Sequence, residues 1–229
     1  MSTLMNIAAL VAEIESKVDA MPVRNAPVLR ALRREYSKRL KNASAREVVE
    51  IAAMLIERRR VHRFIGDELI ASRTDALKSL GRTELERLGA GISSWDEVDC
   101  FACYLAGPAW RQGQVDDETI IGWAKMKDRW RRRAALVSTV PLNVKARGGA
   151  GDARRTLCIC NLLMDDRDEM VVKAMSWALR ALATRDVNAV RRFVADNKAR
   201  LAPRVRREVG RKLTTGRKNA RAHQRHDSF

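Results

Sequence analysis

The chain has 229 residues, of which 46% are hydrophobic, so it is long and apolar enough to bury a substantial core. Its 45 Lys and Arg residues outnumber 28 Asp and Glu residues and give a formal net charge of +17, which favours a polyanionic partner, with nucleic acid ahead of a membrane surface. No stretch approaches the roughly 18 consecutive apolar residues of a membrane span, and no signal peptide is recognisable. We therefore expect a protein that does not bind membranes and is cytoplasmic, associated with the nucleoid if prokaryotic.

Apolar residues recur at helical spacing almost from end to end, and alternating strand-like runs are absent. The pattern predicts an all-α protein. In chain order the expected helices are Leu4–Val18, Ala26–Lys41, Ala45–Arg58, Val61–Ala71, Thr83–Leu88, Trp95–Leu105, Asp117–Lys125, Arg129–Ser138, Asp152–Met164, Asp168–Ala183, Val187–Asn197 and Pro203–Leu213.

Side chains that commonly begin helices precede several of these segments. Ser94, followed by Glu97 three residues later, has the spacing of a capping box before the Trp95 helix. Asp166 and Asp168 stand where an N-cap is expected before the helix that follows them, and Asp186 stands in that place before the next helix.

Many short helices in succession are typical of stacked helical pairs rather than of a bundle. In the second half, residues 117–125 pair with 129–138, and 152–164 pair with 168–183, at a period in the range of HEAT-type arrays. We expect a HEAT-like helical repeat solenoid with a concave basic groove. Such a curved array can bring residues from successive repeats onto one surface.

We expect residues 1–213 to form a single HEAT-like repeat domain and residues 214–229 to form a basic, disordered tail. The tail is rich in Arg, Lys, His, Asn and Gln and has no apolar face to bury. One glycine-rich stretch, Arg147–Gly151, has neither a preceding strand nor the Lys-Ser/Thr ending of a phosphate loop, so it is interpreted as a loop between repeats.

Four cysteines, Cys100, Cys103, Cys158 and Cys160, lie within apolar helical segments. We interpret them as reduced core thiols. The alternative, a zinc site, is disfavoured because the Cys158 and Cys160 thiols would diverge on a helix and no Gly-rich knuckle flanks either pair. We expect neither a metal nor a cofactor.

The only histidines are His62, His223 and His226, one in an Arg-rich segment and two in the tail. These positions do not suit a histidine metal triad or a Ser-His-Asp arrangement. Hydrolysis by an activated serine or by zinc-bound water is therefore disfavoured.

Trp95 and Asp99 are four residues apart, which places an indole and a carboxylate on one helix face. Trp177 has Lys173 and Arg180 one turn away on either side. Indole faces and one acid among several cations suit a positively charged sugar on a phosphate backbone.

A run of three arginines fans out around its helix by about 100° per residue, so only one or two can face a groove. Arg133, three residues after Trp130 and followed by an apolar run, is the best candidate for a fixed contact. Three other tryptophans are interpreted as core or structural: Trp110, Trp123 and Trp130.

Three runs, in order and spacing, resemble the AlkD family of DNA alkylation repair glycosylases, which is built from HEAT-like repeats. The runs are Ser94–Asp99 (SWDEVD), Trp130–Ala135 (WRRRAA) and Val172–Arg180 (VKAMSWALR). The resemblance is specific over about residues 93–183 and weaker on the flanks. The family's Gly-Ile or Gly-Val turn near the N-terminus is replaced by Met21–Pro27, and the basic tail is an addition.

The resemblance implies roles for individual residues. Trp95 and Trp177 would cradle the deoxyribose, Asp99 would stabilise the developing sugar cation and position water, and Arg133 would hold the DNA backbone. We add three further expected DNA contacts from the neighbouring basic residues: Arg132, Lys173 and Arg180. The resemblance also implies that the lesion stays largely stacked, which suits an open groove without a deep pocket.

These observations predict a monofunctional glycosylase that excises N3- or N7-alkylated purines from duplex DNA, acting as a monomer. The first alternative is a non-enzymatic HEAT-repeat module that binds damaged or branched DNA and would be indifferent to the loss of Asp99. The second is a scaffold for an acidic protein, which leaves the placement of the tryptophans unexplained.

Overall fold

The computed structural model describes residues 6–58 and 63–216. All regular structure in these two ranges is helical, which confirms the predicted fold class and is consistent with a helical repeat solenoid. The chain divides into two compact units between Ile120 and Ile121. In unit 1 the elements are α1 (Ile7–Asp19), α2 (Ala26–Arg39), α3 (Ala45–Arg58), α4 (Arg63–Ala71), α5 (Thr74–Lys78), α6 (Arg82–Leu88), α7 (Trp95–Phe101), η2 (Ala102–Ala106) and α8 (Gly107–Arg111).

The division falls within α9 (Asp117–Ala124). The elements of unit 2 are α10 (Arg129–Ser138), α11 (Val140–Asn143), η3 (Lys145–Arg147), α12 (Ala153–Leu162), α13 (Glu169–Leu182), α14 (Val187–Asp196) and α15 (Pro203–Thr215). The concave groove and the single-domain organisation remain predictions. The expected tail begins two residues later than predicted, since α15 includes Thr214 and Thr215, and residues 217–229 lie outside the described residues.

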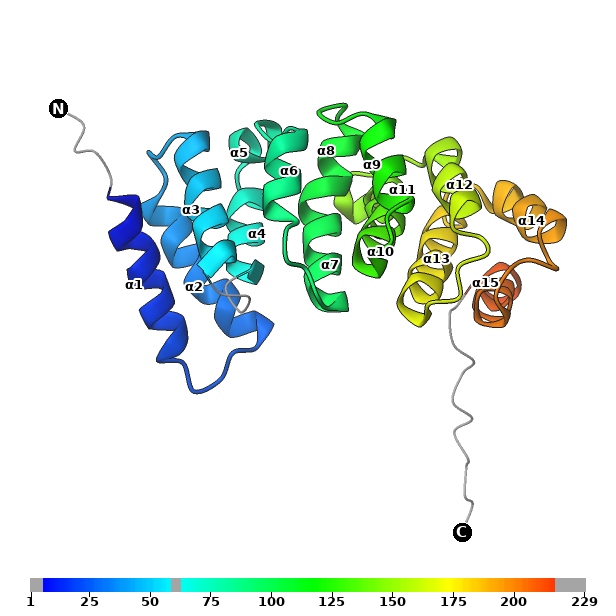
Figure 1. The fold of residues 1–229 in the computed structure, drawn as a ribbon, viewed down its shortest axis with the longest axis horizontal. Helices are drawn as coiled ribbons and strands as arrows, with labels where there is room; N and C mark the ends of the chain where they lie inside the picture. Colours follow the sequence, from blue (N-terminus) through cyan, green and yellow to red (C-terminus); the bar gives the residue numbers. More distant parts are fainter. Residues whose placement is uncertain (1–5, 59–62, 217–229) are drawn as a thin grey trace, which may run out of the picture. The chain divides into compact units, whose positions relative to one another are not determined.

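Unit 1 has two rows of helices. One row consists of α2, α4 and α7, each packed against the next, and the other is formed by α1, α3 and α5 (Figure 1). The tight contact between α3 and α4 passes Gly66, where a Cβ atom would lie 3.0 Å from the Ala52 carbonyl oxygen. Helices α2, α4 and α7 of the first row supply the residues of the candidate site in this unit.

Unit 2 repeats this arrangement. Its first row consists of α10, α13 and α15, while α12 packs against α13, and α14 packs against both α13 and α15. The predicted pairing of residues 152–164 with 168–183 is therefore confirmed by the contact between α12 and α13. Helix α13 is the centre of the unit, and nine of its 14 residues are buried.

A single helical rod runs from α7 through η2 into α8. Pro108 has no N–H and cannot make the usual bond to the residue four positions earlier. The preceding amide, that of Gly107, bonds instead to the Ala102 carbonyl five positions back, which gives η2 its π-helical turn. The sequence predicts one helix ending at Leu105 here, and the rod continues beyond it to Arg111.

Helix starts were predicted correctly at Ser94, Asp168 and Asp186, whereas Asp166, also a candidate, is not the N-cap of α13. Asp168 accepts the Met170 amide and Asp186 accepts the Ala189 amide, as N-caps do. Ser94 makes no capping bond with its side chain. Glu97 accepts the backbone N–H of Ser93 at 2.8 Å, one residue before the Ser94 N–H that a capping box would use.

Three short helices, α5, α8 and α11, are missing from the prediction because their few residues present too little periodicity. The glycine-rich stretch is the predicted loop, joining η3 to α12. It passes so close to α11 that a Cβ at Gly149 would lie 2.5 Å from the Pro141 carbonyl oxygen. None of the helices in the described ranges has the length and hydropathy needed to cross a membrane.

Candidate functional site

The predicted indole and carboxylate begin α7. Trp95 is the first residue of the helix and Asp99 follows one turn later, so both lie on one face. The Trp95 side chain is 56% exposed, unusually high for a tryptophan, while Asp99 is half-buried. An indole that contributed only to the core would not stand in solvent, so its exposure favours a role in binding.

The neighbourhood of α7 is acidic. Glu97 is 6% exposed and lies near Asp67 of α4, which is completely buried. Neither carboxyl oxygen of Asp67 has a hydrogen-bond partner, and burial raises the pKa of this carboxyl to about 8, with further rises from Glu97 and Glu68 opposed by Arg63.

Cys100 lies next in sequence to Asp99 and close to the Asp67 carboxyl. Burial, reinforced by Asp67 and other acids, raises the pKa of its thiol to about 12. The group is therefore a neutral thiol and not a nucleophilic thiolate.

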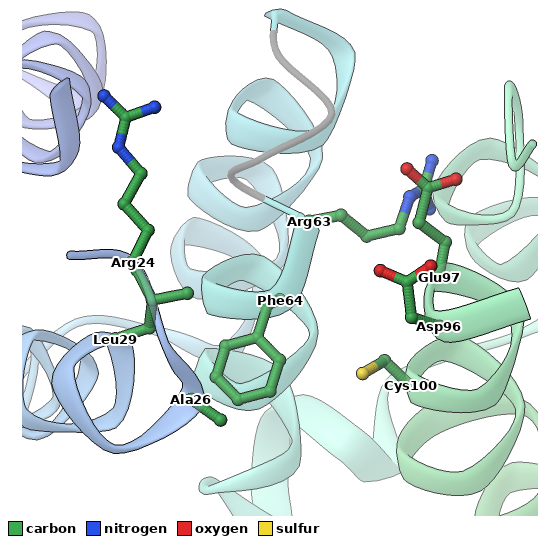
Figure 2. A pocket seen from close by; sticks show the side chains of 8 residues that line it. All are labelled: Arg24, Ala26, Leu29, Arg63, Phe64, Asp96, Glu97 and Cys100. Atoms are coloured by element: carbon green, nitrogen blue, oxygen red, sulfur yellow. The ribbon is translucent and has the colours of Figure 1, made fainter. Parts of the chain in front are cut away.

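A pocket with a volume of about 650 Å³ lies beside this helix, within unit 1 (Figure 2). It is lined by residues from the first turns of α2 and α4, from both turns of α7 and from the segment before α2: Arg24, Ala26, Leu29, Arg63, Phe64, Asp96, Glu97 and Cys100. An open groove without a deep pocket remains a prediction, and this pocket of unit 1 was not anticipated from the sequence. The lining residues are widely separated in sequence, so no local motif indicated the pocket.

In unit 2, the candidate arginines of α10 are bound to the protein itself. Arg133 is 5% exposed, and its Nη1 donates to the Met170 carbonyl at the start of α13 at 2.6 Å. Arg132 donates to Asp166 at 2.6 Å and to the carbonyls of Met126 and Lys127. Both side chains therefore join α10 to the elements around it, and their DNA contacts stay a prediction.

Trp177 is half-buried on α13, flanked as predicted by Lys173 and Arg180. Arg180 donates to the hydroxyl of Ser176 at 3.2 Å and lies 4.0 Å from a carboxylate oxygen of Glu208 in α15. The pKa of its guanidinium is lowered by burial. The Lys173 ammonium is more exposed and pairs with Glu169 at 2.8 Å.

Trp95 and Asp99 belong to unit 1, whereas Arg133 and Trp177 belong to unit 2. Within each unit the structure places the two predicted residues on the same helix or on packed neighbours. The meeting of all four residues on one surface remains a prediction.

Helix α15 carries a basic surface that the sequence analysis missed. Arg206, Arg207 and Arg211 are exposed and have no ion-pair partner among the described residues. Val205 and Val209 are buried on the opposite side, which orients the arginines outward. The helical periodicity of this segment could have indicated which arginines lie on the face opposite the buried valines, and so distinguished them from the paired Arg204.

The residues interpreted as structural have mixed outcomes. Trp110 and Trp123 are buried as predicted, and Trp130 is half-buried with the Arg129 guanidinium 4.8 Å from its ring centre. All four cysteines are free thiols, but Cys158 is exposed, so its assignment to the core is wrong. It is on the outward face of α12. In residues 6–58 and 63–216 no three His, Cys, Asp or Glu side chains are grouped so that they could hold a metal ion.

The described ranges are all-helical, with an exposed indole and a neighbouring carboxylate on α7 and outward arginines on α15. In a chain of net positive charge these features are typical of a nucleic-acid-binding protein. The family model described as DNA alkylation repair enzyme matches residues 18–213. The chain belongs to this family, as its resemblance predicted, and has a role in the repair of alkylated DNA. The curated proteins include no match to the chain.

Proposed function

We propose that the protein is a monofunctional alkylpurine-DNA glycosylase, which hydrolyses the N-glycosidic bond of positively charged N3- or N7-alkylated purines in duplex DNA. The observation that supports this most is the pairing on α7 of an indole that is 56% exposed with a carboxylate one turn away. Membership of the DNA alkylation repair enzyme family supplies the substrate class.

The chemistry needs few catalytic groups. An alkylated purine already carries positive charge, so the bond from C1′ to the base nitrogen breaks with its electron pair going to the base, without a general acid. The sugar that remains is oxocarbenium-like. Asp99 stabilises this cation and orients a water molecule, which adds to C1′ and gives up a proton to the Asp99 carboxylate, from which it passes to solvent.

Indole faces stabilise cations through the ring quadrupole, by about 0.5 to 2 kcal/mol each. Trp95 and, from the second unit, Trp177 would hold the sugar in this way, with Arg133 at the DNA backbone. The resemblance to the AlkD family supports these roles. The half-buried state of Trp177 leaves one part of its ring for packing and another for the sugar.

Affinity for the duplex would come from cations that are not already committed to the fold. The outward arginines of α15, Arg206, Arg207 and Arg211, are of this kind. Arginine suits phosphate because its planar fork donates two parallel hydrogen bonds. We propose that these residues contact the DNA backbone. The further contacts expected from the sequence, Lys173, Arg132 and Arg180, would be made in addition to their bonds within the protein.

The test is base release from a duplex that contains 7-methylguanine, measured together with DNA binding over a range of salt concentrations. The glycosylase releases the methylated base and leaves an abasic site. A non-enzymatic DNA-binding module would bind with a steep salt dependence but release nothing, and a scaffold for an acidic protein would do neither. The last two outcomes would each overturn the proposal.

A further inference from the structure

The pocket in unit 1 adjoins the face on which the proposed chemistry takes place. Asp96 and Cys100 line it and lie about 100° around α7 from Trp95 and Asp99, respectively. A group that leaves a sugar held at Asp99 would therefore need to move only across the width of one helix. The volume of about 650 Å³ is within the range of small-molecule sites, roughly 300 to 1,000 Å³.

The lining suits a flat ring. Figure 2 shows the Phe64 ring between Ala26 and Leu29 on one side and Asp96 and Cys100 on the other. Apolar and aromatic surface therefore dominates the walls, and the polar groups lie on α7 and at the ends of α2 and α4. An aromatic base with a polar edge matches this combination of apolar walls and a few polar groups.

The charges that line the pocket balance, with two arginines and two carboxylates, so they do not favour phosphate. Both arginines that line it have acceptors in the protein: Arg63 donates to the carbonyls of Leu88 and Ala90, and Arg24 donates to the Asp19 carbonyl. Figure 2 also shows Arg24 pointing away from the Phe64 ring. What remains on the pocket wall is carboxylate, in a chain whose formal net charge is +17.

Asp96 is the carboxylate best placed to bind a ligand. Its Oδ1 accepts the Ser94 hydroxyl, and among the described residues no donor reaches its Oδ2. Glu97, by contrast, is engaged with the Ser93 amide. An acceptor of this kind selects an occupant with N–H donors or a positive charge, and it repels the DNA backbone.

We infer that this pocket holds the alkylated purine after its bond to deoxyribose has broken, with the ring against Phe64 and an N–H group donating to Asp96. Cleavage leaves an electron pair on the freed ring nitrogen, which is then an acceptor, so the exocyclic amine of an adenine or guanine derivative supplies the N–H donor. The inference rests on the proposed function, since only a glycosylase generates a free base. It requires no extrusion of the base beforehand and is compatible with a lesion that is stacked until cleavage.

The experiment is titration of the full chain with 3-methyladenine, followed by calorimetry, which needs no catalysis. We expect saturable binding of one base per chain. Phe64→Leu removes the aromatic wall but keeps an apolar side chain, and Asp96→Asn removes the charge with little change in shape. Each should weaken binding by about tenfold.

Asp196→Asn is the matched control, because this exposed acid at the end of α14 is in the other unit. It should bind the base as the unaltered chain does. Circular dichroism and thermal melting of each variant establish that a loss of binding is not a loss of fold. Absence of saturable binding, or equal binding by the chain and both pocket variants, would overturn the inference.

Failure of the inference and failure of the proposed function give different results. A chain that releases 7-methylguanine from DNA but binds no free base would leave the glycosylase intact and remove the pocket's role. A chain that binds 3-methyladenine but releases nothing from DNA would contradict the glycosylase.

Discussion

Helix α7 in unit 1 and helices α10 and α13 in unit 2 carry the two halves of the predicted site, and they use their functional side chains differently. Trp95 of α7 is 56% exposed and takes no part in the core. Arg133 of α10 is 5% exposed and is bound to the Met170 carbonyl. Unit 1 thus presents groups available to a ligand, whereas unit 2 presents groups that also hold its helices together.

The comparison shows that a charge pattern in sequence does not distinguish a binding arginine from a structural one. Arg132 and Arg133 belong to the run that resembles the AlkD family, and both have acceptors within the protein. Arg207 and Arg211 belong to no motif and extend into solvent without an ion-pair partner in the described ranges. The difference depends on tertiary contacts, and the variants below separate the two kinds of residue.

The largest expected loss of stability is at Arg133. Arg133→Ala removes the donor to the Met170 carbonyl and the buried stem of the side chain, so we expect the free energy of unfolding to fall by about 3 kcal/mol. Urea denaturation followed by circular dichroism measures it. A change below about 0.5 kcal/mol would contradict the structural role of this arginine.

Asp67 makes the stability of the folded chain depend on pH. Burial raises its pKa in the folded protein to about 8, far above the unfolded value near 4. The stability gained from its neutral form is complete below about pH 4 and is lost as the pH rises towards 8. Asp67→Asn stays neutral throughout and should therefore be more stable than the unaltered chain at pH 7, by about 4 kcal/mol.

Thermal melting of the two proteins between pH 4 and pH 9 checks this prediction. The difference in melting temperature should be smallest at the acidic end, grow with rising pH and level off above about pH 8. A constant difference across the range would show that Asp67 has an ordinary pKa.

Trp95 should affect activity without affecting stability. Trp95→Ala removes a cation-stabilising indole, so we expect base release under single-turnover conditions to slow by about tenfold. Because the side chain is exposed, the free energy of unfolding should stay within about 0.5 kcal/mol. Met126→Ala, at another exposed large hydrophobic residue, is the control and should change neither quantity. Loss of stability in Trp95→Ala would show that this indole contributes to the fold and would contradict the prediction.

The smallest effect is expected at single arginines of α15. Arg207→Gln should lower duplex affinity and reduce the slope of log K against log salt by about 0.9, the value for one phosphate contact. Arg204, on the same helix, pairs with Glu169 and Glu208, so Arg204→Gln is the comparison and should leave the slope unchanged. Fluorescence anisotropy of a labelled duplex measures both, and equal slopes for the two variants would remove α15 from the interface.

The fold was largely predictable from sequence because helical periodicity and capping chemistry are local. The aspartate caps at Asp168 and Asp186 show this, as their acceptor geometry depends only on the next few residues. The π-helical turn before Pro108 follows from a missing N–H and could have been anticipated. The short helices α5, α8 and α11 could not have been anticipated, because a few residues are too short a stretch to show helical periodicity.

The site was predictable only in part. The shared face of Trp95 and Asp99 follows from a spacing of four, and the structure has both on α7 as expected. The pocket could not be predicted, since its wall combines Leu29, Phe64 and Cys100 from three helices. The exposure of Cys158 likewise depends on which face of α12 is covered by α13.

The central claim is that Asp99 stabilises the sugar cation, and the most direct measurement is single-turnover release of 7-methylguanine from duplex DNA by the chain and by Asp99→Asn. Glu118→Gln, at an exposed acid in the first turn of α9, is the control for loss of one negative charge. We predict that Asp99→Asn slows release by about a hundredfold or more while duplex affinity is retained, and that Glu118→Gln releases base as the chain does. Equal rates for the chain and Asp99→Asn would contradict the account.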